Sequence, residues 1–176
     1  PLLAMSNNKQ NTEFRLTHLN INGLRNKIHE VIETLKYRKS SILFVTESRL
    51  SENVPSSHIQ IDGYNCVRKD RKGKQGGGLL IYYKSELKVT ENTIAELKEC
   101  EYICIDMQLS KRKHARFLHI YRPPNCNTQL FLQSLDTTLN TIDCTSRPLV
   151  VLGDINIDLL GNTAVVQNYC SIFQSY

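Results

Sequence analysis

Short apolar runs alternate with polar turns along the chain, and this pattern predicts its secondary structure. Residues 14–22 form a run rich in Leu and Ile that Gly23 interrupts, which is typical of a strand. Within residues 26–39 the apolar side chains recur at helical spacing, and a short buried strand follows at residues 42–45. The chain is therefore predicted to open with a strand, a helix and a strand.

The middle of the chain is predicted to be a series of short strands separated by turn residues, and the end returns to helices. The prolines at positions 123 and 124 close the series, because proline cannot continue a strand ladder. The expected later elements are strands at 64–69, 78–83, 87–90, 102–109, 115–121 and 149–152, and helices around 130–139 and at 164–173. Runs of strands with helices near both ends predict an α+β fold with sheets inside and helices outside.

Composition narrows the class of protein. A chain of 176 residues predicts one domain, and no apolar run approaches the roughly 20 residues of a membrane span. The first residues lack the pattern of a secretory signal, so we expect a soluble intracellular protein with no membrane partner. The six cysteines are scattered without CxxC spacing, which predicts reduced thiols, and the five histidines lack the spacing of a structural zinc site.

Positive charge is concentrated in one segment. The net charge is +5, and a basic run lies just before three consecutive glycines. This run is either a solvated hairpin loop or a contact for DNA phosphates, which would give affinity and salt sensitivity with little sequence choice. Its cationic residues are Arg68, Lys69, Arg71, Lys72 and Lys74.

Polar side chains follow several of the predicted strands at the point where each strand ends. Asp154 and Asn156 come directly after the strand at 149–152, and residues at i and i+2 point to the same side. Each polar residue alone has an ordinary explanation as a turn former or an amphipathic strand end. Together they predict an oxygen-rich pocket compatible with magnesium. The full set is Asn20, Asn22, Glu47, Tyr121, Asp154 and Asn156.

Five ordered motifs spread over almost the whole chain resemble one family. They are LNINGLRNK (19–27), TES (46–48), KDR with GGGLLIYY (69–83), YRPPNCN (121–127) and LGDINID (152–158). This set resembles the endonuclease domain of LINE-type, non-LTR retrotransposons, within the endonuclease/exonuclease/phosphatase superfamily that also contains apurinic-site endonucleases. The resemblance implies a four-layer α/β/β/α sandwich of two mostly antiparallel sheets flanked by helices.

The resemblance also implies a reaction and a role for each motif residue. The reaction is phosphodiester hydrolysis that depends on Mg²⁺ or Mn²⁺ and nicks one strand of duplex DNA to prime reverse transcription. Asp154 would activate the attacking water, Asn156 would position that water and the phosphate, and Tyr121 would place its hydroxyl beside a phosphate oxygen. The implied catalytic set is Asp154, Asn156, Tyr121 and Asn20, and the implied metal ligands are Glu47, Asn20 and Asn22.

The resemblance ends before the family's last motif. A Ser-Asp-His type motif closes the family domain, and no histidine follows Asp158 here. We therefore expect residues 1–12 to be a flexible segment and 13–176 to be a C-terminally truncated domain that lacks its last strands and nicks weakly or not at all. A reverse transcriptase in the same polyprotein and a nuclear location are expected by resemblance. The alternatives are a catalytically silent nucleic-acid-binding remnant and a phosphatase of the same superfamily.

Overall fold

Two four-stranded sheets form the centre of the protein. The computed structural model describes residues 13–73, 76–94, 97–142 and 147–176. The first sheet has the order β1-β2-β4-β3 and the second has the order β5-β6-β7-β8. Pairs β1–β2 and β7–β8 are parallel, and the other neighbouring pairs are antiparallel. The strands are β1 (Leu16–Asn20), β2 (Ile42–Thr46), β3 (Tyr64–Lys69), β4 (Leu79–Lys84), β5 (Lys88–Asn92), β6 (Glu101–Gln108), β7 (His114–Tyr121) and β8 (Leu149–Asp154).

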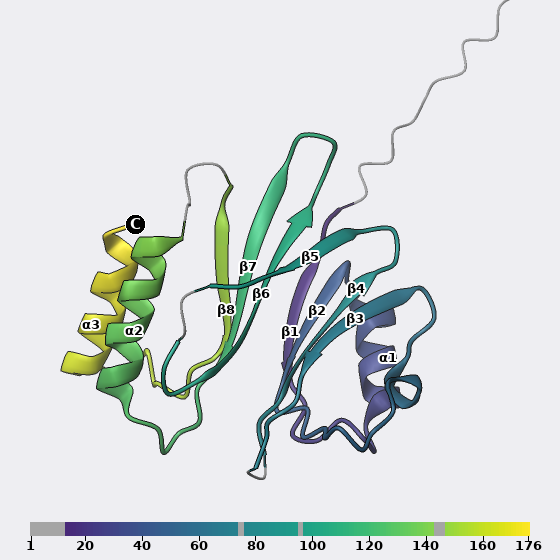
Figure 1. The fold of residues 1–176 in the computed structure, drawn as a ribbon, viewed down its shortest axis with the longest axis horizontal. Helices are drawn as coiled ribbons and strands as arrows, with labels where there is room; N and C mark the ends of the chain where they lie inside the picture. Colours follow the sequence, from purple (N-terminus) through teal and green to yellow (C-terminus); the bar gives the residue numbers. More distant parts are fainter. Residues whose placement is uncertain (1–12, 74–75, 95–96, 143–146) are drawn as a thin grey trace, which may run out of the picture.

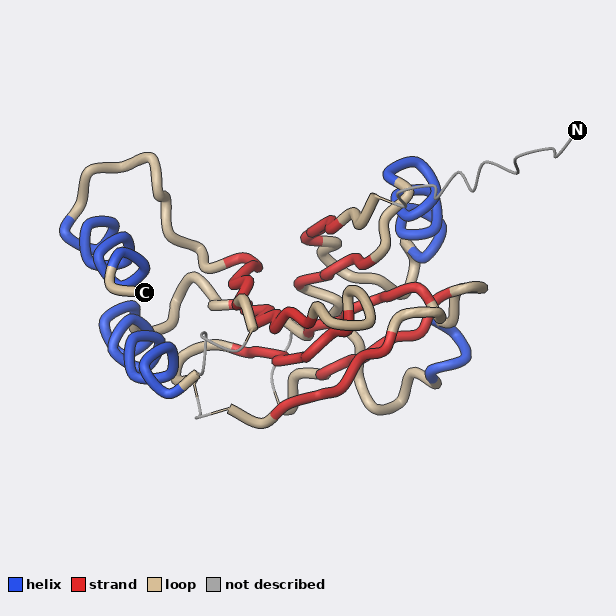
Figure 2. The backbone as a smooth tube through the Cα atoms, turned by 90° about the horizontal axis from the view of Figure 1, so that it is seen from above, coloured by secondary structure: helices blue, strands red, loops and turns tan. Residues whose placement is uncertain are grey.

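Helices cover the outer faces of both sheets. Helix α1 (Ile28–Arg38) lies against the first sheet, while α2 (Thr128–Thr141) and α3 (Ala164–Gln174) lie on the side of the second (Figure 1). Seen from above, the strands lie between the two helical layers (Figure 2). The predicted α+β sandwich of two helix-flanked sheets is confirmed.

The alternation of side chains along each strand explains why three apolar layers form. In β2, Leu43 and Val45 pack with α1, whereas Ile42 and Phe44 point to the second sheet. In β7, Phe117 joins the layer between the sheets, and the intervening positions pack against α2. All five residues of β2 are buried because both its faces and both its edges are covered. Each sheet therefore contributes to two cores at once.

The elements expected from the pattern agree closely with those observed. Strand β3 has the predicted bounds, and β1 is shorter than predicted because Asn22 adopts a left-handed conformation with φ 48°. A short 3₁₀ helix, η1 (Ser56–Ile59), was not predicted. The expected flexible segment 1–12 lies outside the described residues. Within the described ranges, no helix combines the length and the apolar content needed to cross a bilayer.

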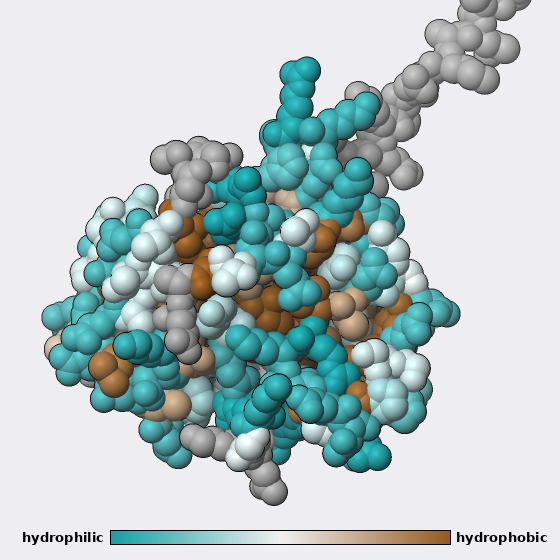
Figure 3. Space-filling model, in the orientation of Figure 1, coloured by the Kyte–Doolittle hydropathy of each residue, from teal (hydrophilic) through white to brown (hydrophobic). Residues whose placement is uncertain are grey.

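One broad face of the protein carries both hydrophilic and apolar residues. Its margins are mostly hydrophilic, and apolar residues are visible in the middle, over the strands between the helical layers (Figure 3). The edge strand β8 is partly exposed, since all six of its residues are only partly buried although four of them are aliphatic.

One histidine is enclosed in the layer between the sheets. His119 has no exposed surface, and within the described residues neither ring nitrogen has a hydrogen-bond partner. Its ring packs edge-on against Phe44, with the centroids 5.3 Å apart, and lies 5.9 Å from the ring of His18. Burial, and secondarily the charge of His18, lowers the pKa of His119 well below its usual value. His119 is therefore neutral in the folded protein.

The first prediction concerns Gly153, which has φ 138°. A methyl group added at this position would overlap the backbone carbonyl of Ile120 on the neighbouring strand. We expect Gly153→Ala to lower the free energy of unfolding by more than about 3 kcal/mol. The matched control is Gly63→Ala, which also has a positive φ, 79°, but open space around the added methyl, so it should cost only about 1 kcal/mol. Urea unfolding measures both, and equal losses would contradict the steric account.

The second prediction concerns stability at acid pH. The unfolded chain binds a proton on His119 near pH 6.5, and the folded chain does not, so this residue makes stability fall as the pH drops below that value. Between about pH 7.5 and about pH 5.5 the unmodified protein should lose about 1.4 kcal/mol more than His119→Leu. Urea unfolding at both pH values tests this. The control is His29→Gln at an exposed position, which should keep the acid loss of the unmodified protein.

Candidate active site

The two sheets place the candidate site where their facing strands end. Strand alternation puts Asn20 on the face of β1 that meets the second sheet, and puts Tyr121 and Asp154 on the facing side of β7 and β8. Tyr121 and Asp154 are register partners at the ends of parallel strands. The site is therefore assembled from the ends of strands in both sheets.

Asn20 links the two carboxylates at this edge. Its side-chain amide nitrogen donates to Glu47 Oε1 and to Asp154 Oδ2, both at 3.0 Å. Its carbonyl oxygen accepts from the backbone N–H of Asn22 at 3.1 Å. One amide group thus brings together two acidic residues that lie 27 and 134 positions away in the chain.

The conformation of Glu47 departs from the strand before it. Strict alternation after Thr46 would send the next side chain toward α1, but Glu47 has φ 55°, which ends β2 and lets the carboxylate bond Asn20. Arg49 donates to Glu47 Oε2 at 3.2 Å. The hydrogen bond from Asn20, together with Arg49, lowers the pKa of Glu47. Glu47 is therefore a stable anion on a partly exposed surface.

Tyr121 lies beside this anion. Its side chain is buried at the end of β7 and interacts with the Glu47 carboxylate. Burial and the neighbouring negative charge of Glu47 raise the pKa of Tyr121 to about 12. The phenol is consequently protonated at neutral pH and remains a hydrogen-bond donor.

The segment after β8 is fixed by Arg122. Asn156 donates its backbone N–H to Asp154 Oδ1 at 3.1 Å and its side-chain amide to the carbonyl oxygen of Arg122 at 2.8 Å. The Arg122 side chain, only 2% exposed, donates to the carbonyl oxygens of Ile155 and Asn156 at 2.7 Å each and to two carbonyls in its own loop. Asp154 and Asn156 are therefore close, as their spacing predicts, but the Asn156 amide is directed to the β7 exit loop.

The cationic residues of the basic run lie in different environments. Arg68 pairs with Asp70 and donates to two backbone carbonyls, and Arg71 pairs with Glu101. The Lys69 ammonium lies 4.3 Å from the centre of the Tyr102 ring. Lys72 is well exposed and pairs with Glu52 at 3.2 Å, and Lys74 lies outside the described residues.

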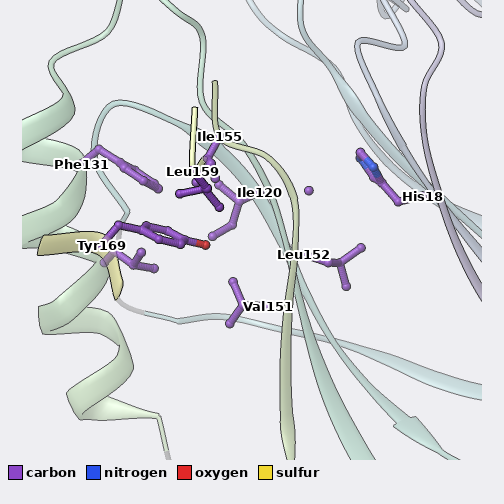
Figure 4. Close-up of a pocket in the computed structure, with 10 residues that line it drawn as sticks. His18, Ile120, Phe131, Val151, Leu152, Ile155, Leu159 and Tyr169 are labelled. Carbon is purple, nitrogen blue, oxygen red and sulfur yellow. The ribbon is translucent and has the colours of Figure 1, made fainter. Parts of the chain in front are cut away.

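A cavity of about 310 Å³ lies behind the site. Figure 4 shows Phe131 and Tyr169 on the side of the helices, the strand residues Ile120 and Val151 near them, and His18 at the opposite side. Gly153, directly before Asp154, also contributes to its wall. Because this wall is mostly apolar, we place the chemistry at the polar strand ends and not in the cavity.

The donor set at the strand ends fits a single hard cation with water ligands. Two carboxylates bonded to the same amide nitrogen supply the one or two anionic oxygens that magnesium takes from proteins. Asn20 directs its amide nitrogen to the carboxylates, so its oxygen is turned toward Asn22. Over the part of the chain that the structure describes, no cluster of three or more His, Cys, Asp or Glu side chains is present.

Sequence reasoning missed Arg49 and Arg122 near the site, and it considered Arg71 only as a possible DNA contact. Arg49 pairs with Glu47, Arg122 fixes the loop of Asn156, and Arg71 lies over the Tyr121 ring. The positions of Arg49 and Arg122 within the TESR and YRPP segments, adjacent to proposed site residues, are a signal that could have identified them. Nothing in the local pattern indicates the partner of Arg71, which is 30 positions away.

Solved structures share this fold. An apurinic-site endonuclease from Archaeoglobus fulgidus matches with a TM-score of 0.67 and 21% identity over 93% of this chain and 71% of the other. A Neisseria 3′ phosphatase bound to product DNA matches with a TM-score of 0.64 and 19% identity over 91% and 71%. The endonuclease domain of TRAS1, a telomere-specific non-LTR retrotransposon, matches with a TM-score of 0.67 and 12% identity over 93% and 70%.

No curated protein sequence matches the chain significantly. At these identities the structural matches establish the fold. The sequence profile of the Endonuclease/Exonuclease/phosphatase family matches residues 17–164, which include every described residue of the candidate site. The chain therefore belongs to the endonuclease/exonuclease/phosphatase family.

Proposed function

We propose that the protein is a magnesium-dependent DNA endonuclease domain that nicks one strand of a duplex, at a low rate as expected from the sequence. The observation that supports this most strongly is the Asn20 amide, which binds Glu47 and Asp154 at one strand edge with Tyr121 beside them. Carboxylates, a neutral phenol and amides are the groups that activate water and stabilise charge on a phosphate. The retrotransposon endonuclease and the DNA-bound phosphatase among the structural matches support a DNA substrate.

The side chains have separable roles in this proposal. Asp154, fixed through both carboxylate oxygens, accepts the proton of the attacking water. As the new P–O bond forms, the bond to the 3′ oxygen breaks, and this oxygen takes a proton from solvent to become a 3′-hydroxyl, which leaves a 5′-phosphate on the other end of the nick. The protonated Tyr121 hydroxyl donates to a phosphate oxygen on which negative charge grows.

Glu47 is the proposed principal metal ligand. Asn20, which ends β1, and Asn22 are the proposed supporting ligands. The bound ion would offset charge on the phosphate oxygens and orient the reacting groups. Asn156 is the proposed residue that orders the attacking water and the scissile phosphate, and for this its side-chain amide would have to leave the Arg122 carbonyl to which it is bonded. Mn²⁺ offers the same oxygen preference and is the expected substitute.

A retroelement role is the finer part of the proposal. The motif order of the sequence and the TRAS1 match support an endonuclease of a non-LTR retrotransposon. In that role the 3′-hydroxyl primes reverse transcription by a reverse transcriptase of the same polyprotein, in the nucleus. Lys69 and Lys72, the described lysines of the basic run, have exposed side chains and are the proposed contacts for DNA phosphates.

The third prediction separates this enzyme from a silent nucleic-acid-binding remnant. Glu47→Gln and Asp154→Asn should each lower the nicking rate at least about a hundredfold, because each removes a charge that acts on the phosphate or the water. Binding of a short duplex should change less than about threefold in the absence of metal. Supercoiled-plasmid nicking measures the first quantity, and fluorescence anisotropy measures the second.

The control for this prediction is Asp158→Asn, a matched substitution outside the network of Asn20. Chelation with EDTA should abolish nicking by the unmodified protein, and added Mg²⁺ should restore it. Nicking that survives in both site variants, or that persists in EDTA, would contradict the proposed mechanism. Phosphate release from a 3′-phosphorylated duplex without nicking would favour the phosphatase alternative, which the Neisseria match brings into consideration.

A further inference from the structure

One arginine of the basic run turns toward the interior of the protein. The Arg71 side chain is only 17% exposed, and its Nε atom bonds Glu101 Oε1. The other carboxylate oxygen of Glu101 accepts from the backbone N–H of Gly78 at 2.6 Å. Arg71 lies between β3 and β4 of the first sheet, and Glu101 begins β6 of the second. The ion pair therefore links the two sheets.

The same guanidinium lies over the ring of Tyr121. The central carbon of Arg71 is 5.5 Å from the centre of this ring, within the range of cation–π contacts. Glu101 is the register partner of Tyr121 on the neighbouring strand, so both contacts of Arg71 are made at one point of the second sheet. A methyl group on Gly77 would overlap the guanidinium, so a side chain at this position would displace Arg71.

The glycines beside Arg71 also bind the segment that follows Glu47. The carbonyl oxygens of Gly77 and Gly78 accept from the backbone N–H groups of Arg49 and Ser48, at 2.8 and 3.0 Å. Tyr121 and the Glu47 segment are thus tied to neighbouring points of one loop. The position of the phenol relative to Glu47 depends on this loop.

We propose that Arg71 is a positioning residue, which fixes the Tyr121 ring against Glu47 and joins the two sheets at the site, and is not a contact for DNA phosphate. This inference rests on the proposed function, because it assigns the importance of Tyr121 to phosphate hydrolysis. Lys72, the next residue, provides the contrast. Its side chain is 85% exposed, and its ion pair with Glu52 at 3.2 Å is a surface pair that contributes little to stability.

The experiment compares Arg71→Met with Lys72→Met on duplex DNA. Arg71→Met should lower kcat for nicking at saturating DNA about tenfold or more, because the phenol loses its fixed position, while Kd keeps its dependence on salt. Lys72→Met should weaken binding and reduce the slope of log K against log salt by about 0.9. The proposal is overturned if Arg71→Met reduces the salt slope by that amount, or if it leaves kcat unaltered.

A second measurement does not depend on activity. In protein labelled with 3-fluorotyrosine, the Tyr121 ¹⁹F resonance is assigned by its loss in Tyr121→Phe. Arg71→Met and Glu101→Gln should both shift this resonance, whereas Lys72→Met should not. An unshifted resonance in both variants overturns the positioning role. If the variants shift the Tyr121 resonance but the unmodified protein nicks no DNA, the positioning role of Arg71 is supported and the proposed function is refuted. The two failures are therefore distinguishable.

Thermal unfolding separates positioning from loss of the fold. Glu101→Gln preserves the size of the partner and its bond to Gly78, and should retain most of the melting temperature while lowering kcat in the same direction as Arg71→Met. A Glu101→Gln protein that keeps its melting temperature, its kcat and its Tyr121 resonance would overturn the proposal even if Arg71→Met fails to fold.

Discussion

The candidate site depends on one side-chain amide that bridges two sheets. Glu47 follows a strand of the first sheet and Asp154 ends a strand of the second, and both accept from the same nitrogen of Asn20. Carboxylates gathered at one edge of a fold need hydrogen-bond donors that stabilise their charged form. Asn20 supplies these donors without adding charge. The face-to-face packing of the sheets brings Glu47 and Asp154 within hydrogen-bonding distance of Asn20. The electrostatics of the site therefore depend on the fold.

Backbone strain is concentrated around this amide. Asn22, Glu47, Arg49 and Asn156 all have positive φ, between 48° and 55°, although none is glycine. Such conformations cost about 1–3 kcal/mol each and persist only where surrounding bonds fix them. Here the bonds are visible: backbone N–H groups at 23 and 24 donate to carbonyls at 47 and 48, and N–H groups at 48 and 49 donate to the glycine loop. The strained turns direct side chains toward the site, which strand alternation alone would not do.

The Asn20 bridge and the strained turns explain which features of the site could be predicted from the sequence and which could not. Apolar runs mark strands, so the positions of Asn20, Glu47, Tyr121 and Asp154 at strand ends could be predicted from local pattern and motif order. The individual bonds could not, because they join segments with no local relation. The left-handed conformation of Glu47 has no compositional signal. The spacing of Asp154 and Asn156 predicted a shared side, yet the buried Arg122 fixes the Asn156 amide against a separate loop.

The distribution of charge also explains why the cationic residues of the basic run need not all bind DNA as a single surface. In the proposed reaction Glu47 and Asp154 would meet a phosphate of the same sign, and Arg49 pairs with Glu47, one of the two carboxylates. A divalent cation at Glu47 would reverse the sign of the site, so the protein does not need every arginine nearby for the substrate. Arg71 pairs with Glu101, and Arg68 pairs with Asp70. Both ion pairs stabilise the loop that precedes β4. Partly buried guanidinium groups with carboxylate partners preserve the geometry of the loop, and the exposed lysines of the run are the ones proposed for phosphate.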